Sequence, residues 1–411
     1  MDASDIPIRV GGAGDWDAIW KLLAQLFHTT PSDENSAYER EVFEPGRALI
    51  AEDDGSIVGH AAAYTRELTV PGAIVPAAHV TLVGVAPTHR RRGILTRMMD
   101  RQLRDVAAAG NEPIAVLWAS ETRIYPRFGY GPAAQRLKME ISTTDVRLPA
   151  TPAPRGRLRQ VEPTEAIKDF TQVYEGLRAT RVGWSSRGGL WWEHLLADPL
   201  EHRGGATPSY GVVHETADGP TGYAIWSTKS EWDNRGPNGQ VLIREIVAAD
   251  PEAYLTLWRF LLSLDLTRRA SMSFAAVDEP LQYLVDEPRR LGITLADALW
   301  IRVVDLPAAL TARRYSAPLD VVIDVTDPLI AENTGRWRLA VDDSGTATCT
   351  RSAAPADLAC TILELGTAYL GAVSFAALAA AGTVHELTPG TLPRVTAAFR
   401  WHRMPQATEV F

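Results

Sequence analysis

The sequence predicts an α+β protein with mixed sheets, arranged as three consecutive domains. Of its 411 residues, 46% are hydrophobic and 22% are charged, a composition typical of a globular protein with several cores. The first ~145 residues alternate between extended and helical hydrophobic patterns, and a weaker copy of that pattern follows. A third region begins after Asp305-Leu-Pro. We therefore expect domains at residues 1–147, 148–303 and 304–411.

The first region predicts a strand-rich domain with two main helices. Apolar residues at helical spacing from Trp16 to Phe27 predict an amphipathic helix, and a second stripe begins at Ile94 and stops at Gly110. Asp54-Gly55 is a strong hairpin signal between two extended segments. The extended segments are expected at residues 48–53, 57–64, 67–70, 78–85 and 114–118.

A proline-rich stretch around residues 148–157 is the expected linker to the second copy. A hairpin is predicted around Asp218-Gly219, followed by a strand at 240–247 and a helix that includes Tyr254 to Leu262. Where the first copy has arginines before its helix, the second has Asp250 and Glu252. These carboxylates would repel a pyrophosphate, so we expect no second cofactor site.

The third region predicts strands at 319–325 and 337–341 and a helical stretch at 367–381. It also carries an apolar stripe, which we interpret as core packing rather than as a lipid tunnel. The stripe consists of Leu365, Tyr369, Leu370, Val373 and Phe375.

Charge and cysteine content exclude several classes of protein. A net charge of −9 argues against a nucleic-acid partner. It either favours cationic partners or only keeps the protein soluble, and both interpretations stay open. Cys349 and Cys360 have no metal-ligand spacing, and no metal is expected. The sequence shows no signal-peptide pattern and no run of 18 apolar residues. We therefore expect a cytoplasmic protein without a membrane partner.

The segment from Val80 to Thr96 carries the clearest chemistry. An apolar strand leads into His89-Arg90-Arg91-Arg92-Gly93, and a helix follows. A helix N-terminus offers unpaired N–H groups and partial positive charge to an anion, and arginines add charge-assisted hydrogen bonds. Glycine lets the backbone approach a ligand closely. The alternative is a solvated basic helix start, but the order of strand, loop and helix favours a phosphate site.

This segment resembles motif A of the GCN5-related N-acetyltransferases, (Gln/Arg)-x-x-Gly-x-(Gly/Ala), through Arg90 and Gly93, whereas Leu95 departs from it. It is also similar to the enhanced intracellular survival (Eis) subgroup, whose pattern is Val-Ala-Pro-x-x-Arg-Arg-Arg-Gly-(Leu/Ile)-Leu. The downstream Eis pattern, Ser-Glu-x-x-Ile-Tyr-x-Arg-Phe-Gly-Tyr-Gly, is matched by residues 120–131. The resemblance implies two acetyltransferase domains, the second degenerate, followed by a sterol-carrier-like domain.

The resemblance also implies acetyl-CoA as co-substrate and a set of residues that bind it. The pantetheine would pair with one strand, the pyrophosphate would lie on the loop and helix start, and two residues would line the far side. In that order, these are Val83, Gly84 and Val85; Arg91, Arg92, Gly93, Ile94, Leu95 and Thr96; and Ser120 and Glu121.

The resemblance makes Tyr125 the general acid, since a phenol with a pKa of ~10 stays protonated at neutral pH. It makes the carboxylate of Phe411 the general base. We interpret His60, His79 and His89 as surface or pocket-lining residues. An acceptor cleft could include Trp16, Phe27, Tyr38, Asp33, Glu34 and Glu409.

The expected reaction is acetyl transfer to primary amines of cationic acceptors, with aminoglycosides and lysine side chains as the acceptors of the family. The resemblance further implies a homohexamer. Two other functions stay open: an acyl-CoA-binding regulator without turnover, and a lipid carrier built on the third domain.

Overall fold

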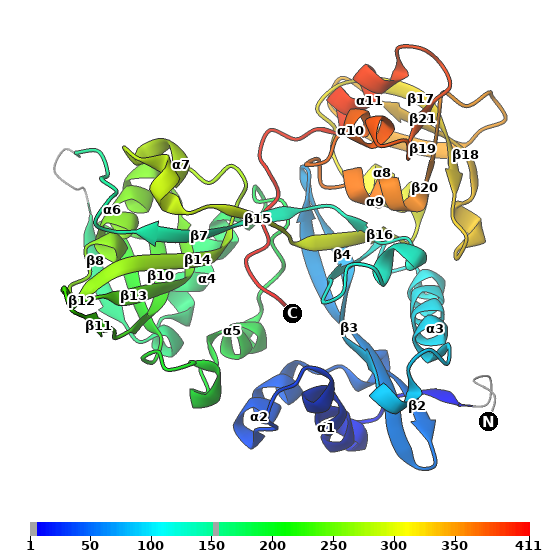
Figure 1. Cartoon of the computed structure of the whole chain (residues 1–411). Helices are drawn as coiled ribbons and strands as arrows, with labels where there is room; N and C mark the ends of the chain where they lie inside the picture. Colours follow the sequence, from blue (N-terminus) through cyan, green and yellow to red (C-terminus); the bar gives the residue numbers. More distant parts are fainter. Residues whose placement is uncertain (1–5, 151–155) are drawn as a thin grey trace. The chain divides into compact units, whose positions relative to one another are not determined.

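The computed structural model describes residues 6–150 and 156–411 (Figure 1). The chain divides into two compact units. The first contains the residues up to Ala134, Ala298–His402 and Val410–Phe411, and the second contains Gln135–Asp297 and Arg403–Glu409. The expected linker includes residues 151–155, which lie outside the described residues.

A mixed sheet forms the centre of the first unit. Its order over the described chain is β1-β2-β3-β4-β5-β16-β6, with a parallel pairing between β4 and β5 and antiparallel pairings elsewhere. Its strands are β1 (Ile8–Val10), β2 (Leu49–Asp53), β3 (Ser56–Val70), β4 (Ala73–Val85), β5 (Ile114–Trp118), β6 (Gly131–Pro132) and β16 (Leu299–Val303).

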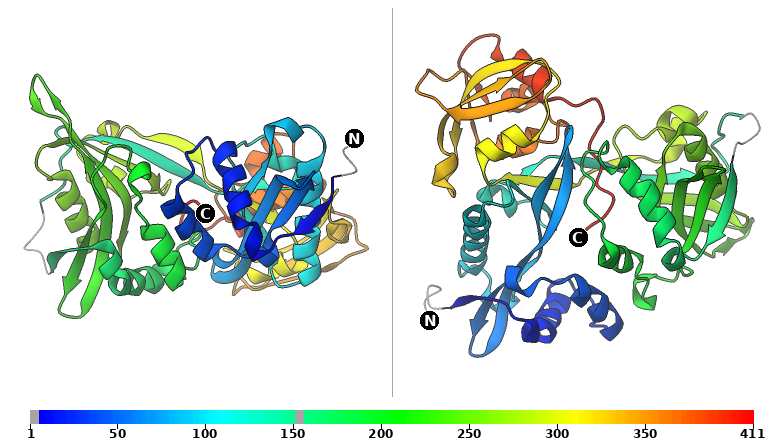
Figure 2. Two further views of the ribbon diagram at one scale, coloured as in Figure 1. Left: turned by 90° about the horizontal axis from the view of Figure 1, so that it is seen from below. Right: turned by 180° about the vertical axis from the view of Figure 1, so that it is seen from behind.

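β3 and β4 form one long hairpin that turns at Pro71-Gly72 (Figure 2). The sequence predicted a break between residues 64 and 67, and that prediction was wrong. Thr65 and Glu67 are exposed while Arg66 and Leu68 are buried, so the polar residues belong to an alternating strand pattern rather than to a turn.

Helices cover both faces of this sheet. They are α1 (Trp16–Leu26) and α3 (Ile94–Ala109), while α2 (Asp33–Val42) packs beside α1, where Ser36 accepts a hydrogen bond from Trp16. Trp16 of α1 packs in a cluster with Ile50, whereas Met98 of α3 packs in a cluster with Ala51. Consecutive residues of a strand point to opposite faces, so α1 and α3 lie on opposite sides of the sheet.

The third region has its own five-stranded sheet in the order β19-β18-β17-β20-β21. Its strands are β17 (Leu319–Thr326), β18 (Gly335–Val341), β19 (Ala347–Arg351), β20 (Leu358–Thr361) and β21 (His385–Glu386). Its helices are α8 (Leu306–Ala312), α9 (Ile362–Ala368), α10 (Phe375–Ala380) and α11 (Thr391–Phe399).

One helix was predicted where the third region has two. Ser374 is the N-cap of α10, and its hydroxyl accepts a hydrogen bond from the N–H of Ala377 in the first turn of that helix. Leu365, Tyr369, Leu370 and Phe375 are wholly buried, as core packing requires. α9 contacts β16 and β6 of the first sheet (Figure 1), so this region belongs to the same compact unit as the first domain.

The second unit repeats the plan of the first sheet. The part β13-β10-β9-β8 is antiparallel and β13 pairs in parallel with β14, as β4 pairs with β5. The strands are β7 (Gln135–Ser142), β8 (Arg157–Val161), β9 (Tyr210–Thr216), β10 (Gly219–Lys229), β11 (Trp232–Asp233), β12 (Gly236–Pro237), β13 (Gly239–Ala248), β14 (Thr267–Ala275) and β15 (Thr294–Asp297). The helices are α4 (Ile167–Arg178), α5 (Gly189–Leu196), α6 (Pro251–Leu262) and α7 (Leu281–Leu284).

Sheet membership crosses the expected domain boundaries. β7 precedes residue 147 in the chain but pairs with β14 and β15 in the second unit. β16 precedes residue 304 but lies between β5 and β6 in the first unit. Each sheet is therefore completed by a strand from the other half of the tandem repeat.

No helix among the described residues is both long enough and apolar enough to span a membrane.

Candidate active site

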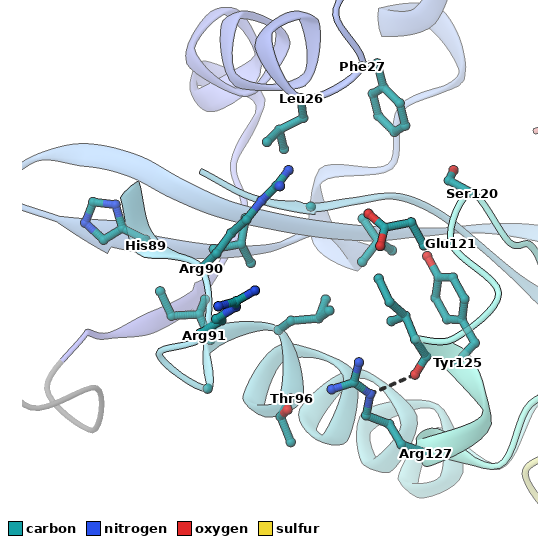
Figure 3. Close-up of a pocket in the computed structure, with 17 residues that line it drawn as sticks. Leu26, Phe27, His89, Arg90, Arg91, Thr96, Ser120, Glu121, Tyr125 and Arg127 are labelled. Carbon is teal, nitrogen blue, oxygen red and sulfur yellow. Dashed lines mark hydrogen bonds between the residues drawn. The ribbon is translucent and has the colours of Figure 1, made fainter. Parts of the chain in front are cut away.

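The first sheet opens between two neighbouring parallel strands. β4 pairs with β5 only from Ala77 to His79, although β4 continues to Val85. Beyond this point a pocket of about 660 Å³ lies within the first unit (Figure 3). It is lined by Leu26, Phe27, Val83, Gly84, Val85, His89, Arg90, Arg91, Gly93, Ile94, Leu95, Thr96, Ser120, Glu121, Ile124, Tyr125 and Arg127.

The arginine-rich loop forms one wall of this pocket. Gly93 has a φ of 75° and precedes α3 without a side-chain cap, so the first N–H groups of the helix are not taken up by a capping side chain. Arg91 is also in the left-handed region, with a φ of 62°. Figure 3 shows Arg90 and Arg91 extending from the loop toward the pocket. This wall can bind an anion.

Arg92, which the sequence assigned to the phosphate site, does not line the pocket. Its Nη1 lies 3.9 Å from Oδ2 of Asp53, which also lies 2.9 Å from Nε2 of His89. Arg90, which was not among the predicted cofactor-binding residues, does line the pocket. The motif alone could not separate these arginines, because their directions depend on the left-handed turn at Arg91.

The end of α1 comes very close to β4 at Gly84. A Cβ atom on Gly84 would lie 2.3 Å from Cδ1 of Leu26, a distance that no side-chain contact allows. Leu26 and Phe27 therefore reach the pocket over this glycine. Trp16 does not line the pocket. It is buried in the hydrophobic cluster between α1 and the sheet, and its Nε1–H donates to Ser36 Oγ at 2.9 Å.

The opposite wall follows β5. Ser120, Glu121 and Tyr125 face the pocket there, and Tyr125 begins a short 3-10 helix, η5 (Tyr125–Phe128). Burial of Tyr125, with the negative charge of Glu121 beside it, raises the pKa of the phenol to about 12. Its ring packs edge-on against Tyr130, with 6.0 Å between the ring centroids. Tyr125 is therefore a protonated donor over the whole neutral range.

Two residues of β4 hold Phe411. Thr81 Oγ1 donates to the main-chain oxygen of Phe411 at 2.9 Å, and the ring of His79 contacts the phenyl ring with 4.5 Å between centroids. Thr81 lies two residues before Val83 on the strand. Phe411 itself is not among the lining residues of the pocket. No role for Thr81 was predicted from the sequence. The feature that could have indicated one is its polar side chain in an otherwise largely apolar strand.

The histidines differ from expectation. His89 lines the pocket, but His60 and His79 are wholly buried in strands of the first sheet. The prediction that all three are surface or pocket-lining residues was therefore wrong for two of them. The ring of His60 packs near Phe43, and the ring of His79 packs against Phe411.

The segment before Phe411 is anchored in the second unit. Arg187 Nε donates to Glu409 Oε2 at 2.7 Å, and its Nη atoms donate to Glu245 at 2.8 and 3.0 Å. The guanidinium also lies 4.1 Å from the centroid of Tyr174. Gln406 donates to the carbonyl of Phe274 at 3.1 Å. Glu409 is therefore a buried anchor, and its carboxylate is already paired within this unit.

We expect Arg187→Met to lower the free energy of unfolding by ~3–5 kcal/mol, because it leaves two buried carboxylates without their cation. Urea denaturation of the full chain, followed by tryptophan fluorescence, measures this loss. Arg203→Met is the matched control in the same unit. Arg203 pairs with Asp198 at 3.2 Å, but both side chains are about a quarter exposed, so ~1 kcal/mol or less is expected. Equal losses in the two variants would contradict the anchoring role.

The matching helix start in the second unit is closed. Asp250 Oδ1 accepts hydrogen bonds from the N–H groups of Glu252 and Ala253, both at 2.9 Å. The N-terminus of α6 is thus capped by a carboxylate of its own chain, and a second anion would be repelled. No group of three or more potential metal ligands occurs in residues 6–150 and 156–411.

Known protein families match the separate domains of this chain, and known proteins match nearly its whole length. Residues 7–133 and 183–303 each match the acetyltransferase (GNAT) domain family, and residues 306–407 match the sterol carrier protein domain family. An uncharacterized N-acetyltransferase of Streptomyces coelicolor is 42% identical over 399 residues, which cover 95% of this chain and 96% of the relative.

N-acetyltransferase Eis of Mycobacterium tuberculosis is 34% identical over 399 residues, covering 94% of each chain. The crystal structure of Eis1 from Mycobacterium abscessus has a TM-score of 0.84 at 32% identity and covers 98% of this chain and 100% of its own. These matches confirm the predicted fold class, acetyl transfer as the activity and acetyl-CoA as the co-substrate. The chain belongs to the Eis family of GCN5-related N-acetyltransferases.

Proposed function

We propose that the first domain transfers the acetyl group of acetyl-CoA directly to a primary amine of a cationic acceptor. Tyr125 is the general acid and the α-carboxylate of Phe411 is the general base. The observation that carries the proposal is the hydrogen bond from Thr81 to Phe411, because it holds this carboxylate on the strand that runs into the pocket.

The pocket residues fit acetyl-CoA. Its pyrophosphate would lie on the uncapped start of α3 beside Arg91, where backbone N–H groups and a guanidinium both favour an anion. The pantetheine would run along Val83, Gly84 and Val85, where β4 has left β5. Ser120 and Glu121 would line the other side.

In the proposed reaction the amine nitrogen attacks the acetyl carbon and forms the new C–N bond. The carboxylate of Phe411 accepts a proton from the amine, directly or through a water molecule. The C–S bond then breaks, and Tyr125 donates its phenolic proton to the departing sulfur. The products are the N-acetylated acceptor and CoA. Solvent then takes the proton from the Phe411 carboxyl group and returns one to the Tyr125 phenolate, so both groups regain their starting state.

Cationic acceptors such as aminoglycoside-like molecules and lysine side chains are the proposed substrates. The net charge of −9 favours their approach, and relatives named Eis are N-acetyltransferases. Release of CoA, measured with a panel of aminoglycosides, polyamines and basic peptides, tests this part. No release with any amine would contradict the proposed function. A homohexamer and a cytoplasmic location complete the proposal, and light scattering of the purified protein tests the hexamer.

Arg91→Glu should raise the KM for acetyl-CoA at least tenfold, because it puts a negative charge where the pyrophosphate is expected. Steady-state kinetics at saturating amine measure the change. Arg92→Glu makes the same change of charge next to it on a side chain that does not line the pocket. We expect a smaller rise in KM for this control. An unchanged KM in Arg91→Glu would place the pyrophosphate elsewhere.

A further inference from the structure

The hairpin of β3 and β4 contains a bulge at the pocket. His60 pairs with Gly84 and Ala62 pairs with Thr81, so Leu82 and Val83 together face the single residue Ala61. Leu82 has a φ of 53°, in the left-handed region that a leucine rarely adopts. Something must hold this unfavourable conformation in place.

The imidazole of His60 makes that contact. Its Nδ1 lies 2.7 Å from the carbonyl oxygen of Leu82. A carbonyl can only accept, so Nδ1 carries the proton and Nε2 is the unprotonated nitrogen. The side chain is wholly buried, and its ring centroid lies 6.1 Å from that of Phe43. Packing therefore keeps the ring and its hydrogen bond in one orientation.

His60 is not a proton carrier. Burial lowers its pKa to about 4, so the ring is neutral at physiological pH. Nε2 is buried and has no hydrogen-bond partner among the described residues. Of the two ring nitrogens of this buried histidine, only Nδ1 makes a hydrogen bond within the described residues, and its acceptor is the carbonyl of the bulge residue Leu82.

The hydrogen bond from His60 also fixes the direction of the next N–H group along the chain. The carbonyl of Leu82 and the N–H of Val83 belong to one planar trans peptide, and they point in opposite directions. By holding the carbonyl toward its own ring, His60 turns the N–H of Val83 away from the ring. Val83 lines the pocket.

We propose that His60 is a positioning residue for acetyl transfer, which aims the N–H of Val83 at the oxygen of the thioester through the carbonyl of Leu82. The inference rests on the proposed function. The N–H would donate to the oxygen as negative charge develops on it, and a donor already aligned needs no rearrangement at that moment.

The second copy has no such device, which supports a role specific to the first. Counted from the loop that follows β13, Tyr223 occupies the position of His60, but its hydroxyl donates to the side chain of Glu245 at 2.8 Å. The bulge of the second copy lies two pairs further along the strand, next to Ile225, which has no imidazole. The bulge residue there, Arg244, is not among the described residues with positive φ. The strained bulge and the buried imidazole thus occur together, in the copy that has the open pocket.

The test compares three variants of the full-length protein. Asparagine carries its amide nitrogen as many bonds from Cα as Nδ1, so His60→Asn can still donate to Leu82. His60→Gln places the nitrogen one bond further out, and His60→Leu removes it. For each variant, kcat and KM are measured with a reactive amine, and the Kd of CoA is measured by calorimetry. CoA has no acetyl oxygen, so its binding reports the contacts of the pantetheine and the pyrophosphate without the contact to the thioester oxygen.

We expect kcat to fall about ten- to a hundredfold in His60→Leu and His60→Gln, somewhat less than when an oxyanion donor is removed outright. The Kd of CoA should stay within about twofold, and His60→Asn should keep kcat within about threefold of the wild type. An unchanged kcat in His60→Leu, or equal losses in all three variants, would overturn the inference. Failure of the wild type to acetylate any amine would instead overturn the proposed function.

Discussion

Tyr125→Phe is expected to lower kcat about 10²- to 10⁴-fold, the range that a general acid contributes. The substitution removes one hydroxyl from a buried ring and leaves the packing against Tyr130 in place. The KM for acetyl-CoA should change little, because the proton is needed only as the sulfur departs. Pre-steady-state measurement of CoA formation in quenched samples separates this chemical step from product release.

Tyr130→Phe is the matched control for this prediction. Tyr130 is wholly buried, touches Tyr125 and does not line the pocket, so the loss of its hydroxyl should leave kcat within a fewfold of the wild type. Equal effects of the two substitutions would show that packing, not proton donation, is disturbed.

The pH profile gives an independent check on Tyr125. Its protonated form is the active one, so activity is lost only as the pH rises through its pKa of about 12. An ordinary tyrosine would begin to lose this form two pH units earlier. We therefore expect no fall of kcat between pH 8 and about pH 10.5 from this group. A descending limb in that interval that disappears in Tyr125→Phe would contradict the raised pKa.

Adding one glycine after Phe411 is expected to lower kcat at least a hundredfold. The phenyl ring can still contact His79, but the carboxylate moves by one residue, ~3.8 Å, and an amide replaces it at Thr81. A neutral amide cannot accept the proton of the amine. Binding of CoA should stay unchanged in calorimetry, because Phe411 does not line the pocket in which we propose that CoA binds.

Phe411→Tyr keeps the carboxylate and changes only the ring, so kcat should fall far less in this control. A full kcat in the glycine-extended protein would exclude the carboxylate as base. In that case a group of the acceptor site, or the amine in its free form, would have to supply this function.

Local patterns were enough to predict the elements of the pocket wall. The strand before Arg90, the break at Gly93 and the helix from Ile94 all follow from the residues in that segment. The hydrophobic periodicity of α3 and the stop at Gly110 depend only on neighbours within a few turns. The resemblance then named Tyr125 and Phe411, whose roles stay predictions.

The partners of strands could not be predicted in the same way. β7 and β16 each have an alternating or buried apolar pattern that would suit either sheet. Periodicity states which face of a strand is buried but not which sheet receives it. β7 and β16 are placed in their sheets by pairing with strands that are far away in the sequence.

The sequence by itself determined the α+β class and the order of strand, arginine-rich loop and helix at the pocket wall, because each depends on residues close together in the chain. Only the tertiary structure decided that Arg90 rather than Arg92 reaches the pocket, and that Thr81 meets Phe411 across 330 positions. It also showed that a buried histidine holds the bulge at Leu82. Such contacts depend on side-chain direction and on the pairing of distant strands, and no local propensity encodes either.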